Sequence, residues 1–317
     1  MEHRPRGRIR VLTYHRIAEI GGDTRLDPRL ISTTPSIFAE QMTHLAGHYK
    51  VVTLREVIDA VRGIIALPRT ATLITFDDGY RDLKDHAFPV LKRLGLPATV
   101  FVPTAFVDRP DRQFWWDRVY HALMSVPRRA LELEPLGSLP LGDPTARLET
   151  IRRVQNHVLT LPHAEAMRVV DAVCGEAGPE GGARSTVLCW DDLRHACRSG
   201  GITVAAHTRT HPILTRMPLE EARAEIVGSL RDVEREIPGA LPAFCYPNGD
   251  HNDEVCAAVR DAGVSVAFTT RNGHNRLAHA DPLRLSRQSI YKRSSLPVFR
   301  ARLTTIGGYL DTWRSRA

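Results

Sequence analysis

Two short stretches of the sequence contain residues that could bind a metal ion and activate water. The stretch LITFDDGY (73–80) runs from a buried-strand pattern directly into two adjacent carboxylates, Asp77 and Asp78. Like charges at neighbouring positions repel, so a cation, a proton or water must offset that repulsion. The stretch HTRTH places His207 and His211 at positions i and i+4. If the chain turns helically there, both imidazoles project to one side and suit a single metal.

These two stretches predict one common site. Asp78 and His207 both follow predicted strands, and the carboxyl ends of parallel barrel strands meet at one face. Two histidines and one carboxylate form a facial set that leaves positions open for water and substrate. One aspartate then binds the metal while its neighbour stays free as a base, and the cation lowers the pKa of bound water.

Apolar runs alternate with helical patterns along most of the chain. Thr53 and Glu56, for example, form a capping box between a strand pattern and the helix EVIDAVRG. Seven or eight such β-α units predict parallel strands, with a barrel favoured over an open sheet. The predicted strands cover residues 9–15, 49–54, 71–76, 98–103, 202–207, 244–247, 264–270 and 283–287.

The interval 108–188 departs from this alternation. It contains FWWDRVYHAL, a Pro/Gly/Leu-rich patch at 135–144 and the helical stretch TARLETIRRVQNHVLTL. We therefore predict one catalytic domain over residues 1–317, with a helical insertion at 108–188 between the fourth and fifth strands. The insertion is either a lid or wall of the substrate groove, or extra outer packing. Trp115 and Trp116 within it are either a sugar-stacking platform or core residues.

Composition excludes several classes of protein. The 317 residues carry a formal charge of +7, but no nucleic-acid-binding motif accompanies it and aromatic residues make up only 6%. No apolar run is long enough for a membrane span, and the first residues lack the pattern of a signal peptide, so we expect a cytoplasmic protein. The five cysteines are scattered without a C-x-x-C pair, which argues against a disulfide framework or a zinc ribbon.

The motifs TFDDGY and HTxxH, in this order and each at a strand end, resemble the first two motifs of the polysaccharide deacetylases. These are carbohydrate esterases related to chitooligosaccharide and peptidoglycan deacetylases. The resemblance extends from the YHRI segment (14–17) to about Arg287. It implies an α/β fold, a distorted (β/α)7–8 barrel, and hydrolysis of a non-peptide amide bond, an N-acetyl group on a sugar. It also implies Asp77 as the base and a metal held by Asp78, His207 and His211.

The third family motif, which resembles R-x-P-Y-G, departs from the pattern and appears here as CYPNG. Cys245 replaces the arginine that would hold the base, and we predict that Arg287 takes over this function. Asn248 replaces the motif tyrosine but keeps its backbone N–H, which can bind an oxyanion. Asn248 and Tyr246 are therefore candidate substrate-binding residues, with packing as the alternative for Tyr246.

The family's late L-x-H motif, whose histidine protonates the leaving amine, has no clear equivalent. His15, at the end of the first strand, is the favoured substitute, and His274 is the other candidate. The ligand set favours Zn²⁺, with Co²⁺, Ni²⁺ or Mn²⁺ as alternatives. The predicted function is metal-dependent deacetylation of an N-acetylhexosamine-containing glycan or glycan precursor. A non-catalytic glycan-binding barrel and a glycosidase are the alternatives.

Overall fold

A computed structural model describes residues 7–21, 26–177, 186–199 and 201–304. The chain divides into two compact units. Unit 1 comprises Met1–Gly22, Pro28–Asp108 and Thr186–Ala317, and unit 2 comprises Asp23–Asp27 and Arg109–Ser185.

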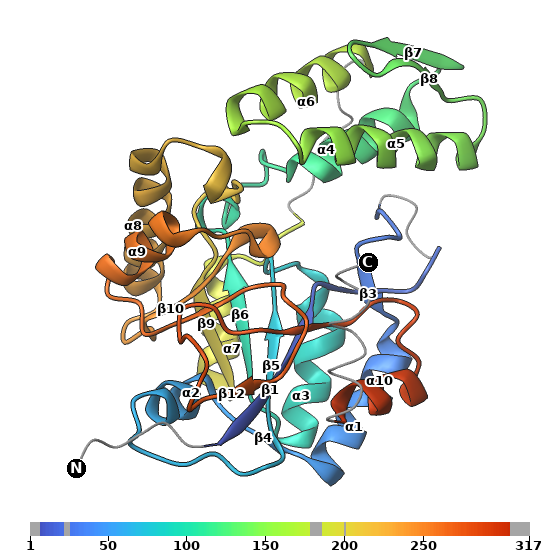
Figure 1. The fold of residues 1–317 in the computed structure, drawn as a ribbon. Helices are drawn as coiled ribbons and strands as arrows, with labels where there is room; N and C mark the ends of the chain where they lie inside the picture. Colours follow the sequence, from blue (N-terminus) through green and yellow to red (C-terminus); the bar gives the residue numbers. More distant parts are fainter. Residues whose placement is uncertain (1–6, 22–25, 178–185, 200, 305–317) are drawn as a thin grey trace. The chain divides into compact units, whose positions relative to one another are not determined.

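A nine-stranded sheet forms the centre of unit 1 (Figure 1). Its strands run in the order β11-β10-β9-β6-β5-β1-β12, while β13 also pairs with β1 and β4 with β5. All of these pairings are parallel except that of β1 with β12. The strands are β1 (Arg8–Tyr14), β4 (Lys50–Val51), β5 (Ala71–Phe76), β6 (Ala98–Val102), β9 (Ile202–Ala206), β10 (Ala243–Cys245), β11 (Val266–Phe268), β12 (Asn275–Arg276) and β13 (Gln288–Ser289). Two short strands, β2 (Arg16–Ile17) and β3 (Ile31–Thr33), form a separate pair.

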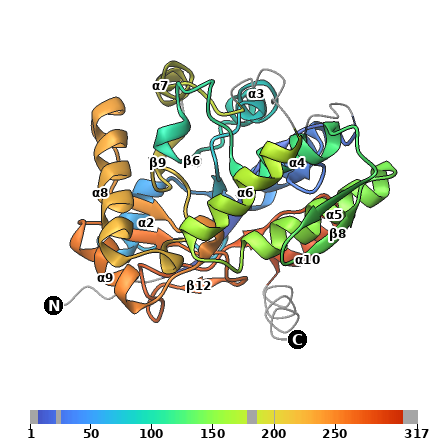
Figure 2. The same ribbon diagram turned by 90° about the horizontal axis from the view of Figure 1, so that it is seen from above.

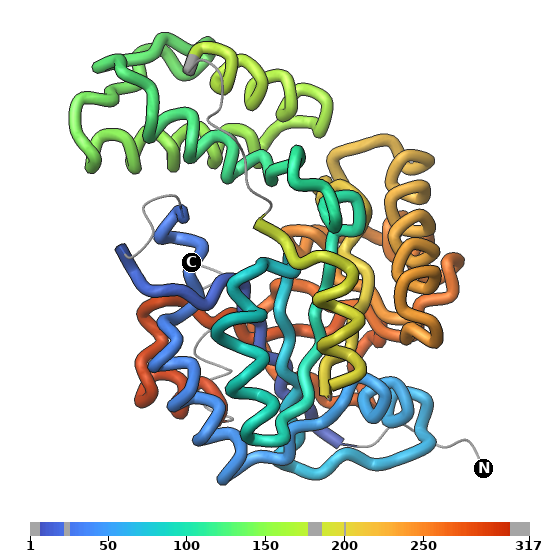
Figure 3. Tube along the Cα trace, turned by 180° about the vertical axis from the view of Figure 1, so that it is seen from behind, coloured from blue at the N-terminus to red at the C-terminus, as the bar shows by residue number. Residues whose placement is uncertain are grey.

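Helices cover the outside of this sheet. From above, α8, α7 and α3 lie around β9 and β6 (Figure 2). Side chains of α3 and α7 line a cavity of about 300 Å³ between these two helices. Figure 3 shows the backbone of unit 1 from behind. The helices of unit 1 are α1 (Pro35–His48), α2 (Leu54–Val61), α3 (Phe88–Leu94), α7 (Trp190–Ser199), α8 (Leu219–Glu236), α9 (Asp253–Asp261) and α10 (Leu296–Leu303), with short helical turns η1 (Leu83–Ala87), η2 (Thr104–Phe106), η3 (Leu214–Arg216) and η4 (Pro247–Gly249).

The strand sequences explain the sheet. All six residues of β5, ATLITF, are buried, as expected of a parallel strand covered on both faces. The predicted capping box is present at the start of α2, where Thr53 and Glu56 bond reciprocally. Gly95 ends α3 with a left-handed φ of 62°, a conformation that glycine adopts without steric cost. Local sequence signals therefore set the bounds of these elements.

The segment 285–289 joins the two edges of the curled sheet. Leu285 forms a parallel bridge with Phe268 of β11, and Gln288–Ser289 pairs as β13 with β1. The predicted (β/α) barrel is thus present as a curled, mostly parallel sheet. The strands predicted at 244–247 and 264–270 are observed as the shorter β10 and β11. Two other predicted strands differ more. The strand predicted at 49–54 is only two residues long, and the one predicted at 283–287 is a single bridge followed by β13.

Unit 2 has a core of its own, formed by the helices α4 (Trp115–Ser125), α5 (Pro144–Val158) and α6 (His163–Ala177) and the hairpin β7 (Ala130–Leu133)–β8 (Gly137–Pro140). The hairpin was not predicted and includes part of the Pro/Gly/Leu-rich patch. Phe114 and Trp116 stack with ring centroids 4.5 Å apart and are buried, which favours core packing for Trp116. Residues 178–185 of the predicted insertion lie outside the described residues. The assignment of 1–317 to one catalytic domain stays a prediction.

Among the described residues, no helix combines the length and the apolar character that crossing a bilayer requires.

Candidate functional site

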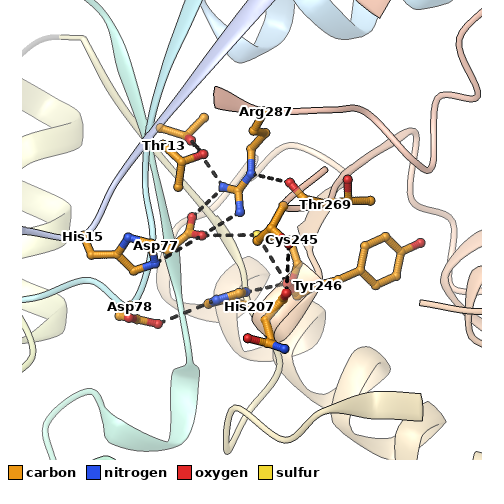
Figure 4. Close-up of polar contacts among 12 residues, drawn as sticks. Thr13, His15, Asp77, Asp78, His207, Cys245, Tyr246, Thr269 and Arg287 are labelled. Atoms are coloured by element: carbon orange, nitrogen blue, oxygen red, sulfur yellow. Dashed lines mark hydrogen bonds and ion pairs between the residues drawn. The ribbon is translucent and has the colours of Figure 1, made fainter. Parts of the chain in front are cut away.

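The candidate site forms where neighbouring strands end. Asp77 and Asp78 follow β5, His207 follows β9, Cys245 is the last residue of β10, and His15 follows β1. In the sheet these strands stand in the order β10-β9-β6-β5-β1 and run parallel, so their carboxyl ends lie along one edge. The sheet order therefore gathers side chains that are far apart in the sequence (Figure 4).

A sharp turn separates the two aspartates. Asp78 and Gly79 both have left-handed backbone angles, with φ of 67° and 61°. Aspartate tolerates this region, but at position 79 a Cβ atom would lie 2.8 Å from Cγ1 of Val102, so only glycine fits. Figure 4 shows the result: the Asp77 carboxylate faces Arg287, whereas the Asp78 carboxylate faces His207.

The HTRTH segment is a loop rather than the helical turn expected from its i, i+4 spacing. Thr208 and His211 have φ of 63° and 59°. The Thr208 hydroxyl donates to the carbonyl of His207 and accepts from the N–H of His211 at 3.0 Å. This folded loop still brings the two imidazoles together, with ring centroids 4.7 Å apart.

Asp78, His207 and His211 form a set that fits a metal ion. One donor atom from each residue lies within 4.8 Å of the other two. Oδ1 of Asp78 is 3.3 Å from Nε2 of His211 and 3.7 Å from Nε2 of His207. This oxygen is buried, yet it accepts no hydrogen bond from the part of the chain that the structure describes. Since an unsatisfied buried carboxylate oxygen is costly, a cation at this point would resolve the deficit.

The hydrogen bonds of His207 also prepare it to bind a metal. Its Nδ1 lies 2.7 Å from the carbonyl oxygen of Cys245, which can only accept, so Nδ1 carries the proton. Nε2 of the neutral ring is then a lone-pair donor, and it faces Asp78. Burial, reinforced by the nearby His211, lowers the pKa of His207 to about 4, so the ring is neutral at physiological pH. For Asp78, burial works to raise the pKa, but the neighbouring imidazoles, His211 foremost, bring it below its ordinary value.

A second set of possible ligands is Asp77, His207 and Cys245, whose donor atoms also lie within 4.8 Å of one another. It fits a metal less well because the carboxylate of Asp77 is already engaged. Both of its oxygens accept hydrogen bonds from Arg287. Burial also raises the pKa of the Cys245 thiol well above its usual value, which disfavours the thiolate that a metal prefers.

Arg287 reaches Asp77 in the way the sequence predicts. Its NH1 and NH2 donate to Oδ1 and Oδ2 of Asp77 at 2.8 and 2.7 Å, a bidentate pair. Nε of Arg287 donates to the carbonyl of Thr269 at 2.8 Å, and the whole side chain is buried. Burial tends to raise the pKa of Asp77, but the charge and hydrogen bonds of Arg287 lower it overall, so the carboxylate is ionised at neutral pH.

Cys245 occupies the motif position of the missing arginine and contacts the same carboxylate. Its Sγ lies 3.7 Å from Oδ2 of Asp77, within the range of a weak thiol donor. The guanidinium that pairs with Asp77 therefore comes from the segment joining β11 to β13, while the thiol fills the space beside it.

His15 is the better placed of the two candidate acids. Its Nε2 is 4.0 Å from Oδ2 of Asp77, and 36% of its side chain is exposed, so a substrate can reach it. His274, in contrast, adjoins Asn275, which pairs with Ile9 at the opposite end of β1 from the site. Burial lowers the pKa of His274 to about 4, which also makes it a poor proton donor.

The two predicted substrate-binding residues differ in their environment. Asn248 is exposed and has a left-handed φ of 57°, and its side-chain amide donates to Asp250. Tyr246 is fully buried, its hydroxyl donates to the carbonyl of Leu283 at 3.0 Å, and its ring points away from His207 (Figure 4). Its phenol is therefore a packing group rather than the predicted substrate contact.

The sequence matches the family model of the polysaccharide deacetylases over residues 66–267. The chain belongs to the polysaccharide deacetylase family. The family predicted from the motifs TFDDGY and HTxxH is thus confirmed.

A curated relative, the poly-β-1,6-N-acetyl-D-glucosamine N-deacetylase of Escherichia coli strain K12, is 34% identical over 93 residues. That match spans 29% of this chain and only 14% of the relative. Among solved structures, the Streptococcus pyogenes deacetylase PplD in complex with acetate has a TM-score of 0.64 and 18% identity, covering 94% of this chain and 98% of that one. IcaB from Ammonifex degensii has a TM-score of 0.59 and 21% identity, covering 93% and 97%. These structures support the fold.

Two carboxylates near the site were missed by sequence reasoning. Glu225 of α8 accepts from the backbone N–H groups of Arg209 and Thr210, at 2.7 and 2.8 Å, and so holds the HTRTH loop. Asp82 accepts from the N–H of Ile17 and lies beside Arg16. The sequence could have pointed to Asp82, because it continues the aspartate motif in FDDGYRD. It could not have pointed to Glu225, which is one of several acidic residues on an amphipathic helix.

Proposed function

We propose that this chain hydrolyses N-acetyl groups on an N-acetylhexosamine-containing glycan or glycan precursor, with a divalent cation held by Asp78, His207 and His211. One observation carries the proposal. The unsatisfied Oδ1 of Asp78 faces two imidazole nitrogens, directly beside a carboxylate that a buried arginine keeps ionised. Membership of the polysaccharide deacetylase family supports the same reaction.

Asp77 acts as the base in this proposal. The bidentate pair with Arg287 fixes the orientation of its carboxylate and lowers its pKa, so the group is unprotonated when substrate arrives. Asp77 accepts a proton from water as the water oxygen attacks the acetamide carbonyl carbon. Arg287 does not touch the substrate; it holds the base in position.

Two further groups complete the reaction. The backbone N–H of Asn248 stabilises the negative charge that develops on the carbonyl oxygen. His15 donates a proton to the amide nitrogen as the carbon–nitrogen bond breaks, so that acetate and the free amine of the sugar leave. Its exposure and its position 4.0 Å from Asp77 suit this function.

The ligand set determines what a cofactor would contribute. A divalent cation bound there would lower the pKa of water and polarise the acetamide carbonyl. Two imidazoles and one carboxylate favour Zn²⁺, with Co²⁺, Ni²⁺ and Mn²⁺ as the alternatives.

The first substrate to test is an oligomer of β-1,6-linked N-acetylglucosamine, the sugar polymer named in the curated relative. Only 29% of this chain matches that relative, so other N-acetylhexosamine oligomers and precursors belong in the same screen. The cytoplasmic location predicted from the sequence stays a prediction; it would favour a precursor over a finished polymer.

The experiment is an acetate-release assay over these substrates, with and without a chelator and after return of Zn²⁺, Co²⁺, Ni²⁺ or Mn²⁺. We expect the chelator to abolish acetate release and a returned cation to restore it. Asp77→Asn should lower the rate of acetate release about 10²- to 10⁴-fold while metal binding persists. Sugar-chain cleavage without acetate would indicate a glycosidase. Glycan retention without release would indicate a binding module.

A further inference from the structure

The loop that follows the two aspartates is tied to the strand that follows His15. Oδ1 of Asp82 accepts the backbone N–H of Ile17 at 2.9 Å, and Oδ2 lies 3.6 Å from NH1 of Arg16. The Asp82 side chain is 12% exposed and that of Arg16 only 2%, so the pair is screened from water. An ion pair in such surroundings is sensitive to the loss of either partner.

Arg16 makes a second contact with the same loop. The centre of its guanidinium lies 3.7 Å from the ring centroid of Tyr80, a close cation–π arrangement. Arg16 is thus held between Tyr80 and Asp82, both within the continuation of the DDGY motif. The YHRI segment and the FDDGYRD segment therefore interlock through side chains, in addition to the pairing of β1 with β5.

His15 lies between the points at which these contacts fix the backbone. On one side, the N–H of Asp77 donates to the carbonyl of Tyr14 at 2.9 Å. At His15 itself, the backbone N–H donates to the hydroxyl of Ser32 at 2.8 Å. On the other side stand Arg16 and Ile17, which Asp82 holds. The imidazole, in contrast, is partly exposed, and its Nε2 lies 4.0 Å from Oδ2 of Asp77.

We propose that Asp82, acting with Arg16, is a positioning residue that aims the His15 imidazole at the reacting amide beside Asp77. The proposal rests on the proposed deacetylase function. Asp82 touches neither substrate nor the metal ligands; it acts only through the backbone that carries His15. Without its carboxylate, the N–H of Ile17 loses its acceptor and the buried guanidinium of Arg16 loses its contact with Asp82, so the segment that presents His15 shifts.

A double-mutant cycle tests this directly. We expect Asp82→Ala to lower kcat for acetate release about 10-fold, within the range by which misplacement of a catalytic group slows a reaction, while KM and metal content stay within twofold. Asp82→Asn keeps an acceptor for the Ile17 N–H and should recover part of that loss. In a His15→Ala background, Asp82→Ala should change kcat less than twofold, because the group it positions is gone.

The proposal would be overturned if Asp82→Ala lowered kcat by the same factor in the wild type and in the His15→Ala background. Loss of bound metal in Asp82→Ala would overturn it as well. Asp192→Asn is the matched control, since Asp192 pairs with Lys84, close to Asp82 in sequence, at 2.7 Å. It should leave kcat unchanged.

A measurement independent of activity separates this proposal from the proposed function. In protein labelled with ¹⁵N-histidine, the ring signals of His15 should move in Asp82→Ala and not in Asp192→Asn. If Asp82→Ala does not fold, Asp82→Asn and Arg16→Lys take its place. Unmoved ring signals would refute the positioning of His15 even if the wild type releases acetate. If no substrate yields acetate, the proposed function fails while the signals still report on the positioning.

Discussion

The two halves of the candidate site are built differently. The ligand half, Asp78, His207 and His211, comes from two loops at strand ends and leaves a buried oxygen without a hydrogen bond from the described residues. The base half, Asp77 with Arg287, joins residues 210 positions apart and satisfies both carboxylate oxygens. The proposed cation would complete the first half, whereas the second is closed by the protein's own charge.

This difference predicts how each half responds to mutation. A change in the ligand half should remove the metal, and activity with it. A change in the base half should leave the metal in place and slow the reaction, because only the orientation and charge of the base are affected. Metal content measured beside kcat therefore distinguishes the two halves.

The largest effect is expected in the ligand half. His211→Ala removes one of the three proposed ligands, so we expect loss of bound metal and a fall in acetate release of at least about 10³-fold. A fall of this size corresponds to the several kcal/mol of transition-state stabilisation that a metal ion supplies. Cys245→Ala is the matched control, because Cys245 belongs only to the rival ligand set. Metal loss in Cys245→Ala but not in His211→Ala would reverse the assignment.

In the base half, Arg287→Ala should lower kcat about 10²-fold with metal content unchanged, because Asp77 is no longer oriented. It should also lower the free energy of unfolding by about 3–5 kcal/mol, since the buried carboxylate is left unpaired. Arg287→Lys keeps the positive charge but not the bidentate geometry. Its kcat and its free energy of unfolding should therefore lie between those of the wild type and of Arg287→Ala. Steady-state kinetics, metal analysis and urea unfolding check these outcomes.

The control for Arg287 is Arg284→Ala, three residues earlier, where the guanidinium pairs with Asp253 away from the site. It should keep full turnover. An Arg287→Ala variant as active as Arg284→Ala would remove the proposed tether.

A smaller effect is expected from Glu225→Gln. Glu225 accepts from the N–H groups of Arg209 and Thr210 and from the Thr210 hydroxyl, so its charge holds the loop between the two histidine ligands. We expect metal affinity to fall about 10-fold, as for other groups that support ligands from behind. Chelator competition measures this, with the exposed Glu221→Gln of α8 as control. An unchanged metal affinity in Glu225→Gln would mean that the HTRTH loop keeps its conformation without the charge of Glu225.

The last prediction concerns stability and pH rather than turnover. Burial raises the pKa of Asp82 to about 6 against the opposing charge of Arg16. Because this folded-state pKa exceeds the ordinary 3.8, the folded protein binds the proton more tightly. The contribution of Asp82 to the free energy of unfolding is therefore fully present below about pH 4 and lost as pH rises through about 6, on the order of 3 kcal/mol.

Urea unfolding of the wild type and of Asp82→Asn, compared across this range, measures the effect. The wild type should lose stability relative to the variant as pH rises. A difference that does not vary with pH would show that Asp82 is ionised with its ordinary pKa.

The sequence was sufficient to place Asp78, His207 and His211 together and to predict most of the fold. β5 was predicted at its observed bounds because six consecutive apolar or β-branched residues end at the carboxylate pair. The meeting of these three residues could be predicted because motif residues at strand ends lie along one edge of a parallel sheet. Local spacing did mislead in one respect: HTRTH is a loop with two left-handed residues, which i, i+4 spacing does not reveal.

The remaining contacts depend on tertiary structure. Arg287 could be proposed only because the motif arginine was missing, and its contact with Asp77 depends on how segment 285–289 joins the sheet edges. Tyr246 was a candidate substrate contact with packing as the alternative, and its buried phenol favours packing. A motif position does not give side-chain direction. Glu225 and Asp82 act through backbone N–H groups, which no spacing rule identifies.

The most direct test of the account is anomalous diffraction at the absorption edge of the bound metal, in crystals of the metal-loaded protein. We expect one peak bonded to the Asp78 carboxylate and to Nε2 of both His207 and His211, with Asp77 still paired to Arg287. A peak between Asp77, His207 and Cys245, or no peak near His211, would contradict the central claim.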